Sequence, residues 1–156
     1  MNQLTRMEGA YTELDQYLEL QLTGKPTPHQ IEGVIARQIL NDQAYFLLCW
    51  GQLEAEINAT CRRAIKRRIN DPDWQVRRAW YLYNPNDKRL SGLSFEDRAA
   101  LVLDRGAGKS SHWARTMFHY RTRNEIAHGT LRSTRIDVSG FIQDCFVIQT
   151  ALHRAA

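Results

Sequence analysis

Long hydrophobic runs and strand patterns are both scarce in this chain of 156 residues. No apolar run approaches the roughly 18 residues that a membrane-spanning helix needs, and the first residues lack the apolar core of a signal peptide. Stretches that alternate apolar and polar residues, which predict strands, are nearly absent. We therefore expect a cytoplasmic protein with an all-α fold and no membrane partner, and the length matches one domain over residues 1–156.

Cysteine is also rare, with three residues in the whole chain. Cys49, Cys61 and Cys145 are odd in number and lie far apart in apolar-rich surroundings. A disulfide framework or a zinc site needs paired or closely spaced cysteines. We therefore interpret all three as buried thiols, and we expect neither a metal nor another cofactor.

Positive charge exceeds negative charge, because 21 Lys and Arg face 17 Asp and Glu, for a net charge of +4. This balance is compatible with a polyanion such as RNA as a partner. Five cations fall within seven positions over residues 62–68. An alternative is a solvated helix end whose cations complement the helix dipole. The candidate contacts to RNA phosphates are Arg62, Arg63, Lys66, Arg67 and, further along the chain, Arg121.

Helix start and stop signals divide the chain into five or six expected helices, which we expect to pack as a single bundle. Thr27 and Gln30 have the spacing of a capping box before a long second helix, and Gly129 follows the end of the fifth. Asp137 or Ser139 is the expected cap of the last helix. The predicted helices cover residues 4–22, 28–68 with a break near 41–42 left open, about 72–82, 94–103, 112–128, and from the last cap to 153.

The fifth predicted helix carries the most informative segment, Arg123-Asn124-Glu125-Ile126-Ala127-His128. Asn124 and His128 are four residues apart, so they share a face within about 40° on an ideal helix. Arg123 is about 140° from His128, and its side chain must bend round the helix to reach the same small group.

A seam of five residues runs along the same helix at intervals of four and three, which is typical of a buried or partner-facing surface. If this seam packs against a two-fold mate, two Arg-Asn-His sets converge on one cleft, because a symmetric interface faces each patch with itself. We therefore expect a homodimer. The seam consists of Trp113, Met117, Tyr120, Asn124 and Ala127.

These residue types suit cleavage of RNA by attack of its own 2′-hydroxyl group. The reaction needs a proton acceptor, a proton donor and stabilisation of the charge on the phosphorane, but it needs no metal. His128 is the candidate acid or base, and Arg123 can hold phosphate oxygens through two parallel hydrogen bonds. Asn124 is the candidate group that orients the imidazole or the phosphate.

The string Arg123-Asn124-x-x-x-His128-Gly129 resembles the Arg-polar-x-x-x-His motif of the HEPN superfamily. The strict match covers residues 123–129, with weaker similarity over residues 45–62. The resemblance implies a helical bundle, a dimeric composite site, metal-independent RNA cleavage, and roles as toxins, with a cognate antitoxin, or in phage defence. It also implies an acidic residue on an earlier helix, for which Glu54 and Glu56 are both candidates.

Two alternatives stay open. The motif also fits an ordinary helix end, and some HEPN domains are inactive, so the alternative function is a non-catalytic helical module that binds RNA, a nucleotide or a protein. A second segment interleaves aromatic residues and cations as single-strand binders do, although helix-spaced aromatics more often belong to a core. That segment contains Trp74, Trp80, Tyr81 and Tyr83 with Arg77 and Arg78.

Overall fold

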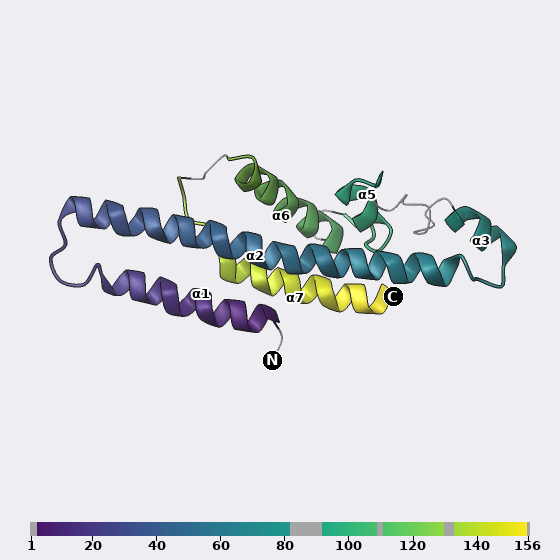
Figure 1. Cartoon of the computed structure of the whole chain (residues 1–156), viewed down its shortest axis with the longest axis horizontal. Helices are drawn as coiled ribbons and strands as arrows, with labels where there is room; N and C mark the ends of the chain where they lie inside the picture. Colours follow the sequence, from purple (N-terminus) through teal and green to yellow (C-terminus); the bar gives the residue numbers. More distant parts are fainter. Residues whose placement is uncertain (1–2, 82–91, 109–110, 130–132, 156) are drawn as a thin grey trace. The chain divides into compact units, whose positions relative to one another are not determined.

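The structure is a computed structural model, which describes residues 3–81, 92–108, 111–129 and 133–155. These residues form helices and turns without a strand, which confirms the all-α prediction. No helix in the described part of the chain combines the length and apolar character that crossing a membrane requires. The described helices are α1 (Gln3–Leu20), α2 (Pro28–Arg68), α3 (Trp74–Trp80), α5 (Phe95–Ala100), α6 (His112–Ala127) and α7 (Val138–Ala155) (Figure 1).

Local capping contacts explain where two of the long helices begin. The backbone N–H of Thr27 donates to Oε1 of Gln30 over 2.8 Å, and the N–H of Gln30 donates back to Oγ1 of Thr27 over 3.4 Å. This reciprocal pair is the predicted capping box. At the start of α7, Oδ1 of Asp137 accepts from the N–H of Gly140 over 2.8 Å. Asp137 is therefore the cap, and Ser139 lies inside the helix.

The structure changes several of the expected helix bounds, of which those of α2 and α3 are the most informative. α2 continues without a break through Asn41 and Asp42. Both side chains are buried, and the carboxylate of Asp42 accepts hydrogen bonds from other segments, so it does not compete for the backbone of its own helix. The third helix begins at Trp74, with Asp73 as its N-cap, and not at residue 72. It ends at Trp80, whereas the expected end near residue 82 lies outside the described residues.

Contacts divide the chain into two compact units, each built from separate stretches of sequence. The first contains Met1–Gln52 and His119–Cys145, and the second contains Leu53–Phe118 and Phe146–Ala156. In the first unit, α1 lies beside the N-terminal part of α2 (Figure 1), and the rings of Phe46 and Phe141 stack with their centroids 4.3 Å apart. The second unit has its own buried residues, including Ile57, Ile65 and Leu152.

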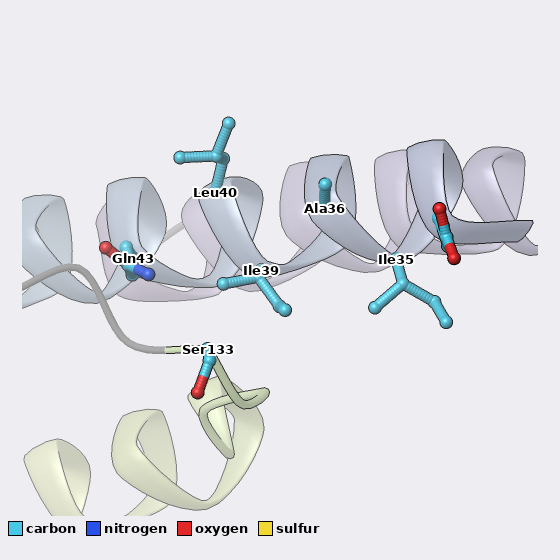
Figure 2. A pocket seen from close by; sticks show the side chains of 7 residues that line it. Ile35, Ala36, Ile39, Leu40, Gln43 and Ser133 are labelled. Atoms are coloured by element: carbon cyan, nitrogen blue, oxygen red, sulfur yellow. The ribbon is translucent and has the colours of Figure 1, made fainter. Parts of the chain in front are cut away.

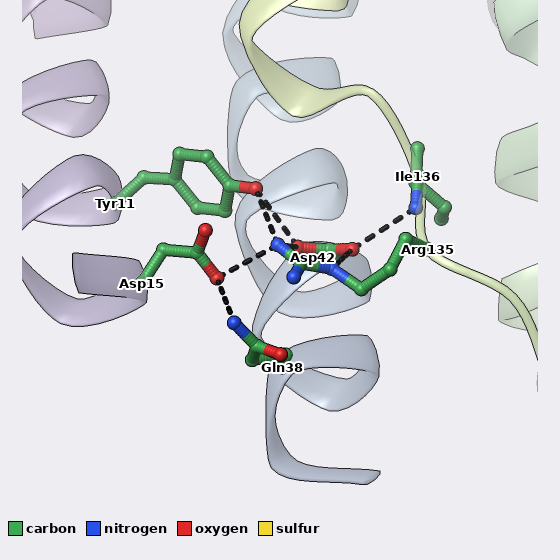
Figure 3. A network of polar contacts seen from close by, with 6 residues as sticks. All are labelled: Tyr11, Asp15, Gln38, Asp42, Arg135 and Ile136. Carbon is green, nitrogen blue, oxygen red and sulfur yellow. Dashed lines mark hydrogen bonds and ion pairs between the residues drawn. The ribbon is translucent and has the colours of Figure 1, made fainter. Parts of the chain in front are cut away.

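A buried carboxylate ties three segments of the first unit together in what we call the Asp42 network (Figure 3). Asp42 on α2 has a fully buried side chain and accepts from Tyr11 Oη over 2.9 Å, Arg135 Nε over 2.6 Å and the backbone N–H of Ile136 over 3.0 Å. Arg135 Nη2 also donates to Asp15 Oδ1 over 2.7 Å. The network thus fastens α1, α2 and the segment that leads into α7.

Electrostatics keep the donors of the Asp42 network in their donating forms. Burial, followed by the hydrogen bond to Asp42, raises the pKa of Tyr11 to about 12. The hydrogen bond to Asp42 is also the main cause that raises the pKa of Arg135 above its ordinary value. Tyr11 therefore remains a neutral hydroxyl donor and Arg135 a cation throughout the physiological pH range.

All three cysteines are buried free thiols, as predicted. Burial raises the pKa of Cys49 and of Cys61 to about 11, and it also raises the pKa of Cys145. Because the thiolate is the form that attacks electrophiles and binds metals, these side chains serve as small apolar groups in the core.

Candidate functional site

The Arg123-Asn124-x-x-x-His128 segment forms the end of α6 and the turn that follows it. The backbone N–H of His128 donates to the carbonyl oxygen of Asn124 over 2.9 Å, so helical hydrogen bonding reaches one residue beyond the end of α6 at Ala127. Gly129 then adopts a φ of 80°, a left-handed conformation that favours glycine and ends the helix as predicted. The backbone of His128 is therefore held at the helix end while its side chain is exposed.

Arg123 bends back toward the other motif residues, although its backbone position is well away from His128 around the helix. Its Nη1 donates to Oδ1 of Asn124 over 3.0 Å, and both side chains are half-buried. Asn124 shares a helix face with His128, so this contact draws the guanidinium toward the face that carries the imidazole. It uses one of the five N–H donors of the guanidinium, and a fork of donors of this kind suits a phosphate.

The opposite side of α6 anchors the helix in the first unit. His119 precedes His128 by nine residues, which is half a turn away, and its Nε2 lies 2.9 Å from Oδ2 of Asp144 on α7. The imidazole of His119 also packs 4.5 Å from the ring centroid of Phe141. Thr122 and Ile126, three and seven residues later, are buried on the same side. No motif or spacing links His119 to Asp144, so sequence reasoning did not find this pair.

The predicted seam is not the core-facing side of α6. Only Met117 among its members is buried, Ala127 is exposed, and Trp113, Tyr120 and Asn124 are half-buried. Tyr120 stacks on the buried ring of Trp50 in its own chain, with centroids 5.8 Å apart. The interpretation of the seam as a buried surface is therefore wrong. The side of α6 that faces the core contains polar Thr and His residues, so it shows no hydrophobic periodicity in the sequence. A partner-facing seam stays a prediction.

The outward side of α6 carries charged residues in line with the exposed imidazole. Arg121, Glu125 and His128 follow one another at intervals of four and three and are all exposed. These intervals place the three residues within about 60° of one another around the helix. Arg121, a predicted RNA contact, thus shares the side of His128. Glu125 is an acidic neighbour that sequence reasoning left out, although it lies inside the motif itself.

The other predicted RNA contacts belong to the second unit. Arg63 Nη2 donates to Oε1 of Glu56 over 3.1 Å and to Oγ1 of Thr60 over 2.8 Å, so it is partly committed to its own helix. Because Glu56 already pairs with the guanidinium of Arg63, less of the charge of Arg63 is available to a phosphate than if this residue were unpaired. The four predicted contacts near the end of α2 are all exposed, namely Arg62, Arg63, Lys66 and Arg67.

Glu54 and Glu56, the two candidates for acidic support, are ion-paired within the second unit. Oε1 of Glu54 lies 3.6 Å from Nη2 of Arg98 on α5. Oε1 of Glu56 accepts from Arg63 and lies 3.5 Å from Nε2 of His153. The motif belongs to the first unit, so support of His128 by either glutamate stays a prediction.

A pocket of about 460 Å³ in the first unit is lined mainly by aliphatic side chains of α2 (Figure 2). Ile35, Ile39 and Leu40 form most of its apolar wall, and Ser133 closes one side. Glu32 is the titratable residue among its lining residues. This pocket therefore offers no set of groups for proton transfer to a phosphate ester, and we do not assign the site to it.

The described residues contain no group of three or more His, Cys, Asp and Glu side chains arranged to hold a metal ion. No family model, no curated protein and no solved structure matches the chain. The candidate site consequently depends on its own chemistry. It brings together an exposed imidazole, a carboxamide and a guanidinium at one end of α6.

Proposed function

We propose that the protein is a metal-independent endoribonuclease that cleaves RNA through attack of the 2′-hydroxyl group at a site formed by Arg123, Asn124 and His128. The observation that carries this proposal is the hydrogen bond from Arg123 Nη1 to Asn124 Oδ1, one helical turn before the exposed residue His128. The resemblance of the motif to HEPN ribonucleases supplies the class of reaction.

Each motif residue has a distinct role in this proposal. The guanidinium of Arg123 binds the scissile phosphate and stabilises the charge that develops on the phosphorane. Asn124 holds the guanidinium in position through its carboxamide oxygen. His128 transfers a proton, either from the attacking 2′-hydroxyl or to the leaving 5′-oxygen.

A homodimer completes the proposed site. One imidazole cannot accept a proton and donate another in the same step, and a two-fold mate supplies a second His128. The outward side of α6 suits such an interface, because Arg121 and Glu125 have opposite charges and would pair across the two-fold axis of antiparallel helices. The biological setting that we propose is a cytoplasmic toxin with an antitoxin protein as partner, or a phage-defence effector.

A substrate without a free 2′-hydroxyl tests the proposed reaction. We expect the protein to cleave an RNA strand, to leave 2′,3′-cyclic phosphate and 5′-hydroxyl ends, and to spare the same strand when every 2′-hydroxyl is methylated. Mass spectrometry of the products distinguishes these ends. Cleavage of the methylated strand would contradict the proposal, and binding of RNA without any cleavage would favour the non-catalytic binding module.

A further inference from the structure

Helix α3 presents its aromatic side chains to solvent instead of to a core. None of its residues is buried, Trp74 is 57% exposed, and Tyr81, which caps the helix, is also 57% exposed. Trp74 and Tyr81 therefore do not belong to a core, which was the alternative that their helical spacing suggested. Trp80 is half-buried, and Tyr83 lies outside the described residues. Two large exposed rings so close in sequence indicate a ligand-binding surface.

Two exposed residues of α3 and its C-cap form one stripe, which we define as Trp74, Arg78 and Tyr81. Their intervals of four and three place them on one side of the helix, and all three are exposed. Cζ of Arg78 lies 6.0 Å from the ring centroid of Trp74, which is a cation–π distance. The two aromatic residues are separated by roughly 10 Å along the helix axis. The α3 stripe thus alternates a ring, a cation and a ring.

A short corner joins α2 to α3 (Figure 1), and side-chain hydrogen bonds fix the backbone there. Nη1 of Arg77 donates to the carbonyl oxygens of Asp71 and Pro72 over 2.6 and 2.8 Å. Oδ1 of Asp73 accepts from the N–H of Gln75 over 2.8 Å and caps α3. Arg77 and Asp73 therefore fix the backbone at the start of the helix that carries the stripe.

Positive charge is concentrated on the same part of the chain. Residues 62–81 contain seven Lys and Arg and two Asp, a net charge of +5, whereas the whole chain carries +4. Both aspartates are engaged, because Asp71 lies 3.6 Å from Nη1 of Arg68 and Asp73 is the N-cap of α3. The segment that ends in the α3 stripe thus carries a positive charge as large as the excess of the entire protein, which favours a polyanion as the ligand of the stripe.

We propose that the α3 stripe binds single-stranded RNA, with unpaired bases stacked on Trp74 and Tyr81 and a phosphate held by Arg78. Exposed rings among cations are the features by which proteins bind single strands, since every base has a face that can stack. A duplex hides those faces between neighbouring base pairs. That the bound strand is the substrate of the enzyme rests on the proposed function. The binding of single-stranded RNA to the stripe does not depend on it.

The test measures the Kd of a fluorescent single strand of about 12 nucleotides, within the site sizes of such proteins, by fluorescence anisotropy. Full 2′-O-methylation prevents cleavage by 2′-hydroxyl attack. We expect Trp74→Ala to raise Kd by about five- to a hundred-fold, and Trp74→Phe to recover most of the affinity because it keeps an aromatic face. Tyr17→Ala is the matched control, because Tyr17 is 61% exposed on α1 but lies outside the basic segment. Circular dichroism checks that each variant folds.

Equal affinity of the wild type, Trp74→Ala and Tyr17→Ala for the methylated strand would overturn the proposal. So would a Trp74→Ala variant that keeps its affinity for the strand but loses binding to vesicles containing phosphatidylserine, because the stripe would then bind a membrane. If Trp74→Ala weakens strand binding while the wild type leaves unmodified RNA intact, the α3 stripe stands and the ribonuclease proposal fails. Tyr81→Ala repeats the test at the second ring, with the same expected direction.

Discussion

His128→Ala is expected to lower kcat for RNA cleavage by about a hundred- to ten-thousand-fold, the range that general acid–base groups contribute. The imidazole is exposed, and the hydrogen bond from the backbone N–H of residue 128 to the carbonyl oxygen of Asn124 does not depend on the side chain. The variant should therefore keep its fold, so lost activity reports on chemistry. Initial rates on a fluorogenic RNA, together with circular dichroism, measure both properties.

His29→Ala is the matched control for that loss. His29 is also exposed, and it lies near the N-terminus of α2, outside the motif. We expect its kcat to equal that of the wild type. An equal fall in activity for both variants would show that the effect does not come from the motif.

Asp42→Ala is expected to lower the free energy of unfolding by about 2–4 kcal/mol. The change removes a carboxylate that accepts from Tyr11, Arg135 and the backbone of Ile136, and it leaves donors without their acceptor. The guanidinium of Arg135 is 38% exposed, so water compensates part of the loss, and the cost is below that of a fully buried ion pair. Urea unfolding followed by circular dichroism measures the difference.

Asp15→Ala provides the comparison for Asp42→Ala. Asp15 accepts from Arg135 Nη2 over 2.7 Å and from Gln38 Nε2 over 3.2 Å, but its side chain is 19% exposed and, among the described residues, it accepts from no backbone N–H. We expect a cost of about 1 kcal/mol, because a partly exposed ion pair contributes little. Similar stabilities of the two variants would contradict the central position of Asp42 in the network.

Local sequence signals predicted the helices well because those signals act within a few residues. The capping box of Thr27 and Gln30 forms as expected, and Gly129 has the positive φ that ends the helix. The Asp42 network could not be predicted in the same way. Arg135 and Asp42 are 93 residues apart, and neither belongs to a sequence motif that predicts the other as its partner. Their pairing results from the packing of α1, α2 and the segment before α7.

The geometry of the candidate site could not be predicted from the sequence, and the roles of its residues stay a prediction. Ideal helix angles separate Arg123 from His128, whereas the long side chain of Arg123 bends to reach Asn124. The core side of α6 was missed because His119 and Thr122 are polar, and hydrophobic periodicity does not detect a polar residue that is buried with a partner. The exposure of Trp74 was missed for the opposite reason, since aromatic residues at helical spacing normally indicate a core.

The ribonuclease proposal is tested most directly by incubating RNA with the wild type and with His128→Ala, purified in parallel, in the presence and absence of EDTA. We predict that the wild type cleaves at the same rate with and without EDTA, and that His128→Ala leaves the RNA intact in both conditions. Equal cleavage by the two proteins, or a wild type that loses its activity in EDTA, would contradict a metal-independent site at His128.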